Sequence, residues 1–236
     1  FSMSVDADAV EVALAHLADL GDAVQCNVAL GPMTTYRVGG PAAIFVRVTD
    51  RRQLVAVADA AHASGLPVLV VGRGSNLLVA DAGFGGLAIG LVDLDATIDI
   101  DRGTAVVTAS AGVALPVLAR KTAACGLTGF EWAVGVPGSI GGAVRMNAGG
   151  HGSDMAASLV AATVFDLGDG TERTLAVDEL GLGFRSSGLA PQQVVFDATL
   201  QLQQGDADES ARLIGEIVSW RRANQPGGQN AGSVFV

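Results

Sequence analysis

Two glycine-rich segments hold the residues whose types and spacing could bind a ligand. The first, Gly72–Asn76, directly follows the apolar run 67–71. A buried strand is therefore expected to end in a turn whose successive N–H groups form an anion-binding nest. The second runs from Gly135 to Gly150, and its many glycines let backbone N–H groups approach a phosphate or a flat ring closely. Two such segments favour a ligand that contains a pyrophosphate.

The composition indicates a globular protein without a nucleic-acid or membrane partner. The chain has 236 residues, of which 50% are hydrophobic, so it can bury a sizeable core in one large domain or two small ones. The net charge of -10, with Lys121 as the single lysine, argues against a nucleic-acid surface. The sequence has no export signal and no apolar window of the roughly 18–20 residues that a membrane span needs. A cytoplasmic protein is therefore expected, and Phe1-Ser2 ahead of Met3 resembles a cloning remnant.

No metal site is expected from the cysteines and histidines. Cys26 and Cys125 lie far apart, without CxxC spacing or a nearby histidine, so buried free thiols are the better interpretation. His16, His62 and His151 also lack ligand spacing and are expected to have structural roles.

The hydrophobic pattern predicts helices separated by strands. Asp50 and Gly65 are start and stop signals for the second helix. The segment 43–71 looks like half of a dinucleotide fold, but Leu77 stands where the Rossmann fingerprint needs a glycine. The predicted helices are 10–20, 50–65, 115–125 and 206–222, and the predicted strands are 43–48, 67–71, 87–91, 105–110, 161–165, 173–176 and 194–202, followed by a loop that enters a strand at 225–236.

Five blocks occur in a characteristic order: 35–42, 72–78, 135–149, 183–187 and 230–235. Together they resemble the UDP-N-acetylenolpyruvoylglucosamine reductase family from about residue 24 to the C-terminus. The resemblance implies an α+β fold with a two-subdomain FAD-binding domain of the vanillyl-alcohol oxidase type. The expected parts are an N-terminal helix at 1–23, an FAD-binding domain at 24–202 with subdomains at about 24–91 and 92–202, and the start of a truncated α+β substrate-binding domain at 203–236.

The resemblance also implies a reaction. Members of this family reduce the enolpyruvyl ether of UDP-N-acetylglucosamine to UDP-N-acetylmuramate, for peptidoglycan synthesis in cell-wall biogenesis, with a hydride that passes from NADPH through FAD. Arg185 resembles the family's arginine that binds and polarises the substrate carboxylate, and Ser233 resembles its proton-donating serine. Hydride addition pushes negative charge into that carboxylate and its α-carbon, so a fixed cation and a proton donor suit the reaction.

The expected cofactor is noncovalent FAD, with its pyrophosphate against the first glycine-rich segment and its isoalloxazine near the second. Ser139 and Asn147 could offer polar groups to the edge of the ring. The predicted FAD-binding residues are Gly72, Arg73, Gly74, Ser75, Asn76, Leu77, Gly135, Val136, Pro137, Ser139, Ile140, Gly142, Ala143, Asn147 and Gly149.

Two departures from the family pattern and several alternatives remain. Phe184 stands where tyrosine is commonest, and the family's catalytic glutamate has no counterpart before Val236, so this chain alone is expected to be inactive. Another flavoprotein oxidoreductase of the same fold is an alternative, although a small-alcohol oxidase would often carry a histidine where this chain has Arg73 and Ser75. A non-catalytic flavin-binding module is a second alternative. Taken alone, Arg185 would be a solvated turn residue and Ser233 a loop hydroxyl.

Overall fold

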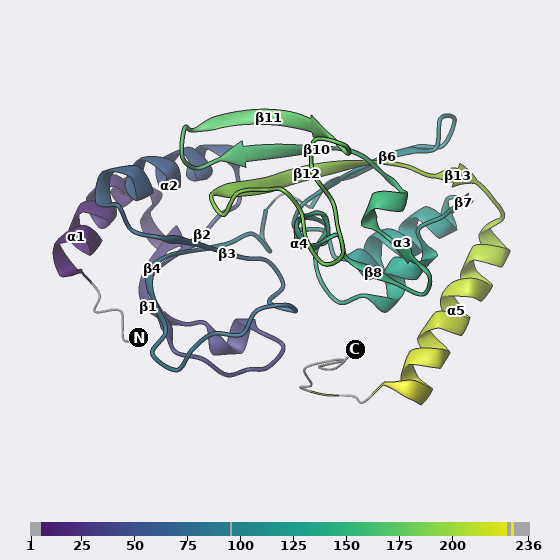
Figure 1. The fold of residues 1–236 in the computed structure, drawn as a ribbon, viewed down its shortest axis with the longest axis horizontal. Coiled ribbons are helices and arrows are strands. Elements are labelled where there is room, and N and C mark those ends of the chain that lie inside the picture. The colour runs from purple at the N-terminus through teal and green to yellow at the C-terminus, as the bar shows by residue number, and fades with distance from the viewer. Residues whose placement is uncertain (1–5, 95, 226–227, 229–236) are drawn as a thin grey trace. The chain divides into compact units, whose positions relative to one another are not determined.

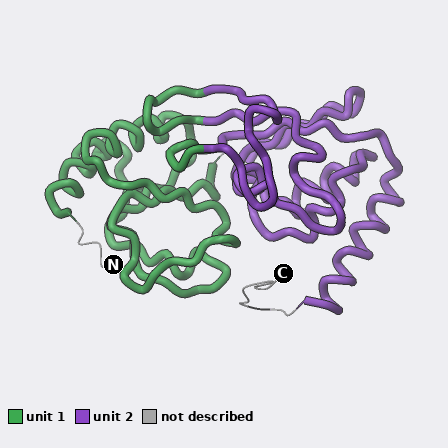
Figure 2. The backbone as a smooth tube through the Cα atoms, in the orientation of Figure 1, with its two compact units in different colours: residues 1–95, 165–172, 190–194 green, residues 96–164, 173–189, 195–236 purple. Residues whose placement is uncertain are grey.

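The computed structural model describes residues 6–94, 96–225 and 228, and the chain divides into two compact units (Figure 2). Unit 1 comprises residues 1–95, 165–172 and 190–194. Unit 2 comprises residues 96–164, 173–189 and 195–236.

Unit 1 is built on a four-stranded sheet with the order β1-β2-β4-β3 (Figure 1). β1 runs antiparallel to β2, whereas β2, β4 and β3 are parallel to one another. Two helices pack against each other in this unit. The elements are β1 (Val24–Ala29), β2 (Pro41–Arg47), β3 (Val68–Val71), β4 (Phe84–Gly90), α1 (Ala7–His16), α2 (Arg51–Ser64) and the 3-10 turns η1 (Ala18–Ala23) and η2 (Gly31–Met33).

Helix α2 begins and ends as the sequence predicts. The Asp50 carboxylate accepts the Gln53 N–H at 3.1 Å, a cap that contributes about 1 kcal/mol. Gly65 ends the helix in the left-handed region at φ +68°. Leu54 and Val57 are fully buried on its inner face.

The first predicted helix is confirmed at its start signal but wrong at its end. Of the two start signals that the sequence offers, Asp6 and Asp8, Asp6 caps α1, which begins at Ala7. It stops at His16 because a 3-10 turn follows and Gly21 takes φ +53°. Strand β1, with its mostly exposed side chains, has no clear apolar alternation and was not predicted.

Unit 2 contains most of a five-stranded sheet with the order β11-β10-β12-β6-β5. The β12-β6 and β6-β5 pairs are antiparallel. Its elements are β5 (Ile98–Asp101), β6 (Val106–Ser110), β7 (Leu127–Thr128), β8 (Gly149–Gly150), β9 (Ser153–Asp154), β10 (Leu159–Asp166), β11 (Thr171–Ala176), β12 (Gln193–Gln201), β13 (Gln203–Gln204), α3 (Leu115–Ala124), α4 (Ile140–Met146), α5 (Ala207–Asn224), η3 (Glu131–Gly135) and η4 (Met155–Ala157).

Two helices of unit 2 pack against the short 3-10 helix η3. Both α3 and α5 contact η3, and α4 contacts β6. Phe130, at the start of η3, is 1% exposed and meets Trp132 edge to face with ring centroids 5.3 Å apart. This packing gives the second glycine-rich segment a rigid base.

The cysteines are free, but the expectation that both are buried is wrong. Cys26 is exposed because it lies on β1, an edge strand, and Cys125 has intermediate exposure at the end of α3. The described residues contain no cluster of three or more His, Cys, Asp or Glu side chains that could hold a metal ion. None of the helices in the described part of the chain is both long and apolar enough to cross a bilayer.

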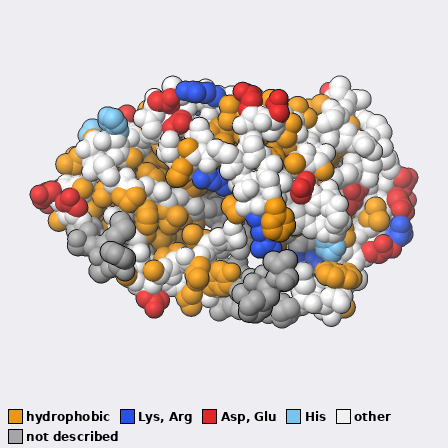
Figure 3. Space-filling model, viewed as in Figure 1, with side chains coloured by type: hydrophobic (Ala, Val, Ile, Leu, Met, Phe, Trp, Pro, Cys, Tyr) orange, Lys and Arg blue, Asp and Glu red, His pale blue; other side chains and the backbone are white. Residues whose placement is uncertain are grey.

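Hydrophobic side chains gather on the left of the face shown in Figure 3, over unit 1. Val38 and Leu78 are among the large apolar side chains exposed in this unit, at 49% and 71%. Both lie in the loops beside the first glycine-rich segment, where the Gly40 N–H donates to the Ala80 carbonyl at 2.9 Å.

Candidate active site

The first glycine-rich segment forms a turn whose N–H groups are left available. It follows the carboxyl end of β3. Within the described residues, no N–H from Gly72 to Leu78 donates a hydrogen bond to another group of the protein. A run of such donors is an anion site of the kind that binds phosphates. The side chains of Arg73 and Asn76 are exposed, whereas Ser75 and Leu77 are half-buried.

Gly74 is required for the shape of this turn. Its φ is +63°, and an added Cβ would lie 2.0 Å from the Met33 carbonyl oxygen. The Thr35 N–H donates to the Gly74 carbonyl at 3.1 Å, so the block 35–42 is bonded to the turn. Gly74 therefore allows close approach by another backbone segment of unit 1, in addition to any approach by a ligand.

A hollow of about 430 Å³ lies beside the turn. Two arginines, Arg47 and Arg73, contribute positive charge to it, and Phe45 and Val71 contribute apolar surface. The volume of this hollow and the residues that line it suit part of a nucleotide cofactor. The full lining is Ala23, Gln25, Met33, Phe45, Arg47, Val71, Gly72, Arg73, Gly90, Val92 and Asp93.

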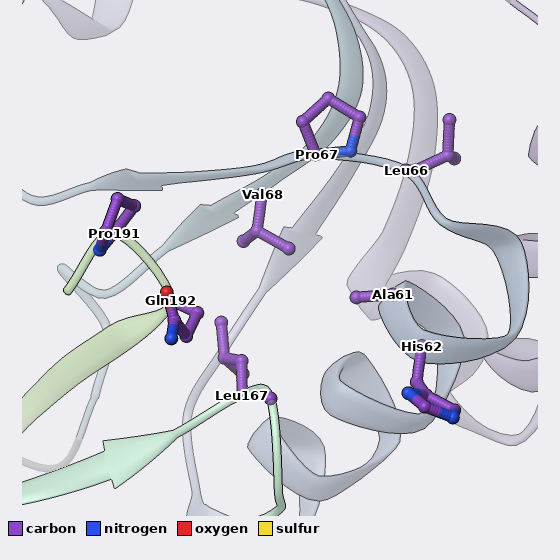
Figure 4. Close-up of a pocket in the computed structure, with 9 residues that line it drawn as sticks. Ala61, His62, Leu66, Pro67, Val68, Leu167, Pro191 and Gln192 are labelled. Carbon is purple, nitrogen blue, oxygen red and sulfur yellow. The ribbon is translucent and has the colours of Figure 1, made fainter.

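A second hollow of unit 1, of about 350 Å³, lies at the amino end of β3 and has a different character (Figure 4). Val68 and Leu167 point toward each other across it, and His62 stands at one side. Ala61, Leu66, Pro67, Gly168, Pro191 and Gln192 complete its lining. Its lining contains no lysine or arginine, so this hollow is poorly suited to a pyrophosphate.

The second glycine-rich segment is not the loop that its composition suggested. Residues 140–146 form helix α4, with Ser139 at its N-cap. The Ile140 N–H donates to Val113 at 2.9 Å, and the Gly141 N–H donates to Ala111 at 3.0 Å. Two N–H donors in the first turn of α4 are therefore bonded to backbone carbonyls of unit 2.

Neighbouring glycines of α4 differ in what surrounds them. A Cβ at Gly141 would lie 2.8 Å from the Ala111 Cβ, so this glycine lets the helix pack closely. Gly142 is exposed, and a Cβ there would meet only the Ser139 Oγ, at 3.6 Å. Among the described residues its N–H has no acceptor. Gly142 is thus the open position of the helix.

The remaining glycines of the segment also make close contacts within unit 2. A Cβ at Gly135 would lie 3.0 Å from the His151 ring, which itself meets Trp220 edge to face at 5.2 Å. A Cβ at Gly149 would lie 2.8 Å from the Ser153 carbonyl oxygen. Of the other predicted ligand residues here, Ser139, Ile140 and Ala143 are buried, Val136 is half-buried and Pro137 is exposed.

Arg185 lies at the tip of an exposed turn. Gly183 and Ser186 pair through two backbone hydrogen bonds of 3.0 and 3.3 Å, and Arg185 takes φ +50° between them. The guanidinium lies 5.7 Å from the centre of the Phe184 ring, which is 86% exposed. Among the described residues no carboxylate pairs with Arg185.

The structure brings this turn to the end of α4. The Asn147 amide donates to the Gly183 carbonyl at 3.2 Å, and the Ser187 hydroxyl donates to the Arg145 carbonyl at 2.7 Å. Asn147 takes the left-handed conformation at φ +39° that ends the helix. Its amide is largely engaged by protein groups, since it also donates to Asp154 at 3.2 Å and accepts the Ala156 N–H at 3.0 Å.

Sequence reasoning missed a buried carboxylate beside this segment. Glu131, 8% exposed, accepts hydrogen bonds from Thr128 at 2.8 Å, the Gly129 N–H at 2.8 Å and Ser210 at 2.6 Å. Burial alone would raise the pKa of Glu131, but Ser210 and neighbouring donors outweigh burial and lower it. A lone acid inside the apolar run 130–136 was the available signal.

Ser233 lies outside the described residues. The two parts that are described fit FAD as a class of ligand. Available N–H groups at 72–78 suit a pyrophosphate, and the open backbone at Gly142 suits close approach by a flat ring.

Comparisons with known proteins agree with this chemistry. A family model described as FAD binding domain matches residues 42–176. UDP-N-acetylenolpyruvoylglucosamine reductase of Gloeobacter violaceus is 42% identical over 219 residues, which cover 91% of this chain and 72% of that protein. The enzyme of the same name from Synechococcus sp. strain RCC307 is 40% identical over 212 residues, covering 89% and 69%. The crystal structure of UDP-N-acetylenolpyruvylglucosamine reductase (MurB) from Thermus caldophilus matches with a TM-score of 0.75 and 35% identity, over 90% of this chain and 74% of that one.

Proposed function

The chain belongs to the UDP-N-acetylenolpyruvoylglucosamine reductase family, and from this premise we propose that it reduces UDP-N-acetylglucosamine enolpyruvate to UDP-N-acetylmuramate. NADPH is the proposed hydride donor and FAD the proposed cofactor. The observation that best supports a role for this chain in the reaction is Arg185, which no carboxylate of the described residues pairs, on a turn bonded to the glycine-rich helix α4.

The proposed FAD site uses the two glycine-rich segments for different groups. The N–H groups from Gly72 to Leu78 would bind the pyrophosphate, with Arg73 adding positive charge. The backbone around Gly142 would approach the isoalloxazine. When bound, FAD supplies the hydride relay between NADPH and the substrate. Attachment is proposed to be noncovalent, since the turn offers Arg73 and Ser75 where a covalent oxidase would often offer a histidine.

Arg185 is proposed to bind the carboxylate of the enolpyruvyl group. Its planar guanidinium can donate two parallel hydrogen bonds to a carboxylate. Negative charge grows on that carboxylate and its α-carbon as hydride arrives at the neighbouring carbon. A cation held at this position stabilises the transition state more than the ground state, as catalysis requires.

Ser233 is proposed to donate the proton that completes the reduction at the α-carbon. Serine is a weak acid, so this role needs a position within hydrogen-bond reach of that carbon and neighbouring groups that stabilise the alkoxide. The turn at 183–187 carries two further hydroxyls, Ser186 and Ser187, but the Ser187 hydroxyl donates to the Arg145 carbonyl.

Residues 1–236 alone are expected to be inactive, so the proposal is tested on a holoprotein that also carries the family's catalytic glutamate. Anaerobic stopped-flow spectroscopy of that holoprotein tests it in two steps. NADPH should bleach the flavin absorbance, and the enolpyruvyl sugar nucleotide should then restore it with formation of the lactyl ether. Flavin that remains with acid-precipitated protein would contradict noncovalent binding. Reduced flavin that reoxidises with oxygen but never with the sugar nucleotide would support an oxidase of the same fold instead.

A further inference from the structure

The position of Arg185 depends on a turn that has little packing of its own. Phe184, Arg185 and Ser186 are all exposed, so the core of unit 2 does not hold these side chains. The Gly188 N–H donates to the Leu180 carbonyl at 2.8 Å and closes the base of the loop. That bond joins the two ends of the loop, but it does not connect the loop to α4.

Two side-chain hydrogen bonds make that connection from opposite directions. Asn147, only 9% exposed, extends from the end of α4 to the Gly183 carbonyl, on the residue two positions before Arg185. Ser187, two positions after Arg185, reaches back to the Arg145 carbonyl of α4. The paired residues are 36 and 42 positions apart in the chain.

The geometry favours fixation of the turn over a purely local role for Asn147. Gly183 donates to and accepts from Ser186, so a bond to the Gly183 carbonyl acts on the residue pair that encloses Arg185. The same amide group is bonded to Asp154 and Ala156 of the neighbouring strand and turn. A rotation of the Arg185 turn would therefore break a partly buried network of hydrogen bonds, so the observed orientation is preferred.

We propose that Asn147 and Ser187 are positioning residues, which set the direction of the Arg185 guanidinium relative to the glycine-rich helix. The inference rests on the proposed role of Arg185 in binding the substrate carboxylate. Displacing a group by about 1 Å from its productive position can reduce the rate by roughly 10²-fold. Both residues then serve the substrate step without contact to the substrate.

A double-mutant cycle in the holoenzyme tests this proposal. Asn147→Ala should slow reoxidation of reduced flavin by the enolpyruvyl sugar nucleotide by roughly 10- to 100-fold, with reduction by NADPH changed less than about twofold. Ser187→Ala, which removes one hydrogen bond, should slow the same step by about 2- to 10-fold. In an Arg185→Ala background both costs should shrink to less than about twofold, because there is no guanidinium left to position.

Hydrogen exchange separates local release of the turn from general destabilisation. Asn147→Ala should raise exchange at the Gly183 and Ser186 amides, while the β6 and β12 amides stay protected. Ser64→Ala is the matched control, since Ser64 in α2 of unit 1 also donates to a backbone carbonyl, at 2.6 Å, and should leave both flavin steps unchanged. If Asn147→Ala does not fold, Ser187→Ala carries the test.

The outcomes distinguish this inference from the proposed function. If Asn147→Ala and Ser187→Ala slow flavin reoxidation equally with and without Arg185, both residues are merely structural. Full activity in both single variants would also overturn the inference. If Arg185→Ala itself leaves reoxidation unchanged, the proposed role of Arg185 fails first. Loss of FAD by Asn147→Ala, with a normal rate in the FAD-saturated enzyme, would instead assign Asn147 to cofactor binding.

Discussion

The two glycine-rich segments look alike in the sequence but use glycine for different purposes. From Gly72 to Leu78 the backbone keeps its N–H groups free of intramolecular acceptors, as far as the described residues show. From Gly135 to Gly150 the chain folds into η3, α4 and β8, and several glycines permit close packing within unit 2. The first segment is suited to hold a ligand directly, whereas the second is a rigid support with one open face.

Backbone conformation explains the difference. Gly74 takes φ +63°, so the turn cannot continue as a helix and its N–H groups do not point at the carbonyls of a preceding helical turn. Gly141 and Gly142 take right-handed helical conformations, and their small size matters more than their freedom of rotation. Under the proposed function, the first segment therefore serves mainly to retain the cofactor, and the turn that the second segment supports serves the substrate step.

Arg185→Ala gives the largest expected effect and separates the two functions. Loss of the guanidinium should slow flavin reoxidation by the enolpyruvyl sugar nucleotide by about 10²–10³-fold, the usual effect of removing one group that stabilises transition-state charge. FAD affinity and flavin reduction by NADPH should change little. Stopped-flow traces of each half-reaction give the measurement, and equal loss in both halves would assign Arg185 to FAD positioning or to the fold.

Gly74→Val tests the first segment. The side chain would meet the Met33 carbonyl and strain the left-handed backbone, so the turn should deform and FAD affinity should fall by roughly 10- to 100-fold, or about 1.4–2.8 kcal/mol. Equilibrium dialysis or flavin fluorescence measures the affinity. Gly65→Val is the matched control, because Gly65 has a similar φ of +68° but no atom within 4 Å of an added Cβ. Similar FAD loss in both variants would show that backbone strain alone is responsible.

Much of the fold could be predicted from local signals, whereas the site could be predicted only in part. Asp50 and Gly65 mark the ends of α2 because capping depends on a few neighbouring residues. Helix α4 was missed because Gly141, Gly142 and the preceding Pro137 are typical of a loop, and only contact with Ala111 shows why a glycine suits the helix. The bonds from Asn147 and Ser187 join residues far apart in the chain, so no local pattern could reveal them.

Glu131→Gln tests how far the second segment depends on its buried support. The substitution places an amide against donors that now bond to a carboxylate, so the free energy of unfolding should fall by about 1–3 kcal/mol at pH 7. The folded-state pKa of Glu131 is lowered, so its stabilisation is present above the unfolded pKa of about 4.3 and is lost as the pH falls through the folded value. Denaturant titrations should therefore show that the free energies of unfolding of the wild-type protein and of Glu131→Gln differ less at acidic pH than at pH 7.

Glu216→Gln is the control, at an exposed carboxylate of α5. It should change the free energy of unfolding by less than about 1 kcal/mol at either pH. A difference for Glu131 that stays constant with pH would contradict the assignment.

The smallest effects are expected from a pair of neighbouring substitutions in α4, and they test the comparison most closely. Gly142→Ala should stabilise the helix by roughly 0.5–1 kcal/mol, since the new methyl group meets only the Ser139 Oγ at 3.6 Å and alanine favours the helical backbone. If the isoalloxazine lies against this open face, the same methyl group should weaken FAD binding, by about 2- to 10-fold.

Gly141→Ala should instead destabilise the fold, because its methyl group would lie 2.8 Å from the Ala111 Cβ and force α4 away from residue 111. Its main consequence should be a lower melting temperature, with FAD affinity largely retained in the protein that remains folded. Thermal unfolding of the apoprotein together with FAD titration of each variant gives both quantities. Unchanged FAD affinity in Gly142→Ala would place the ring elsewhere and leave the second segment with a purely supporting role.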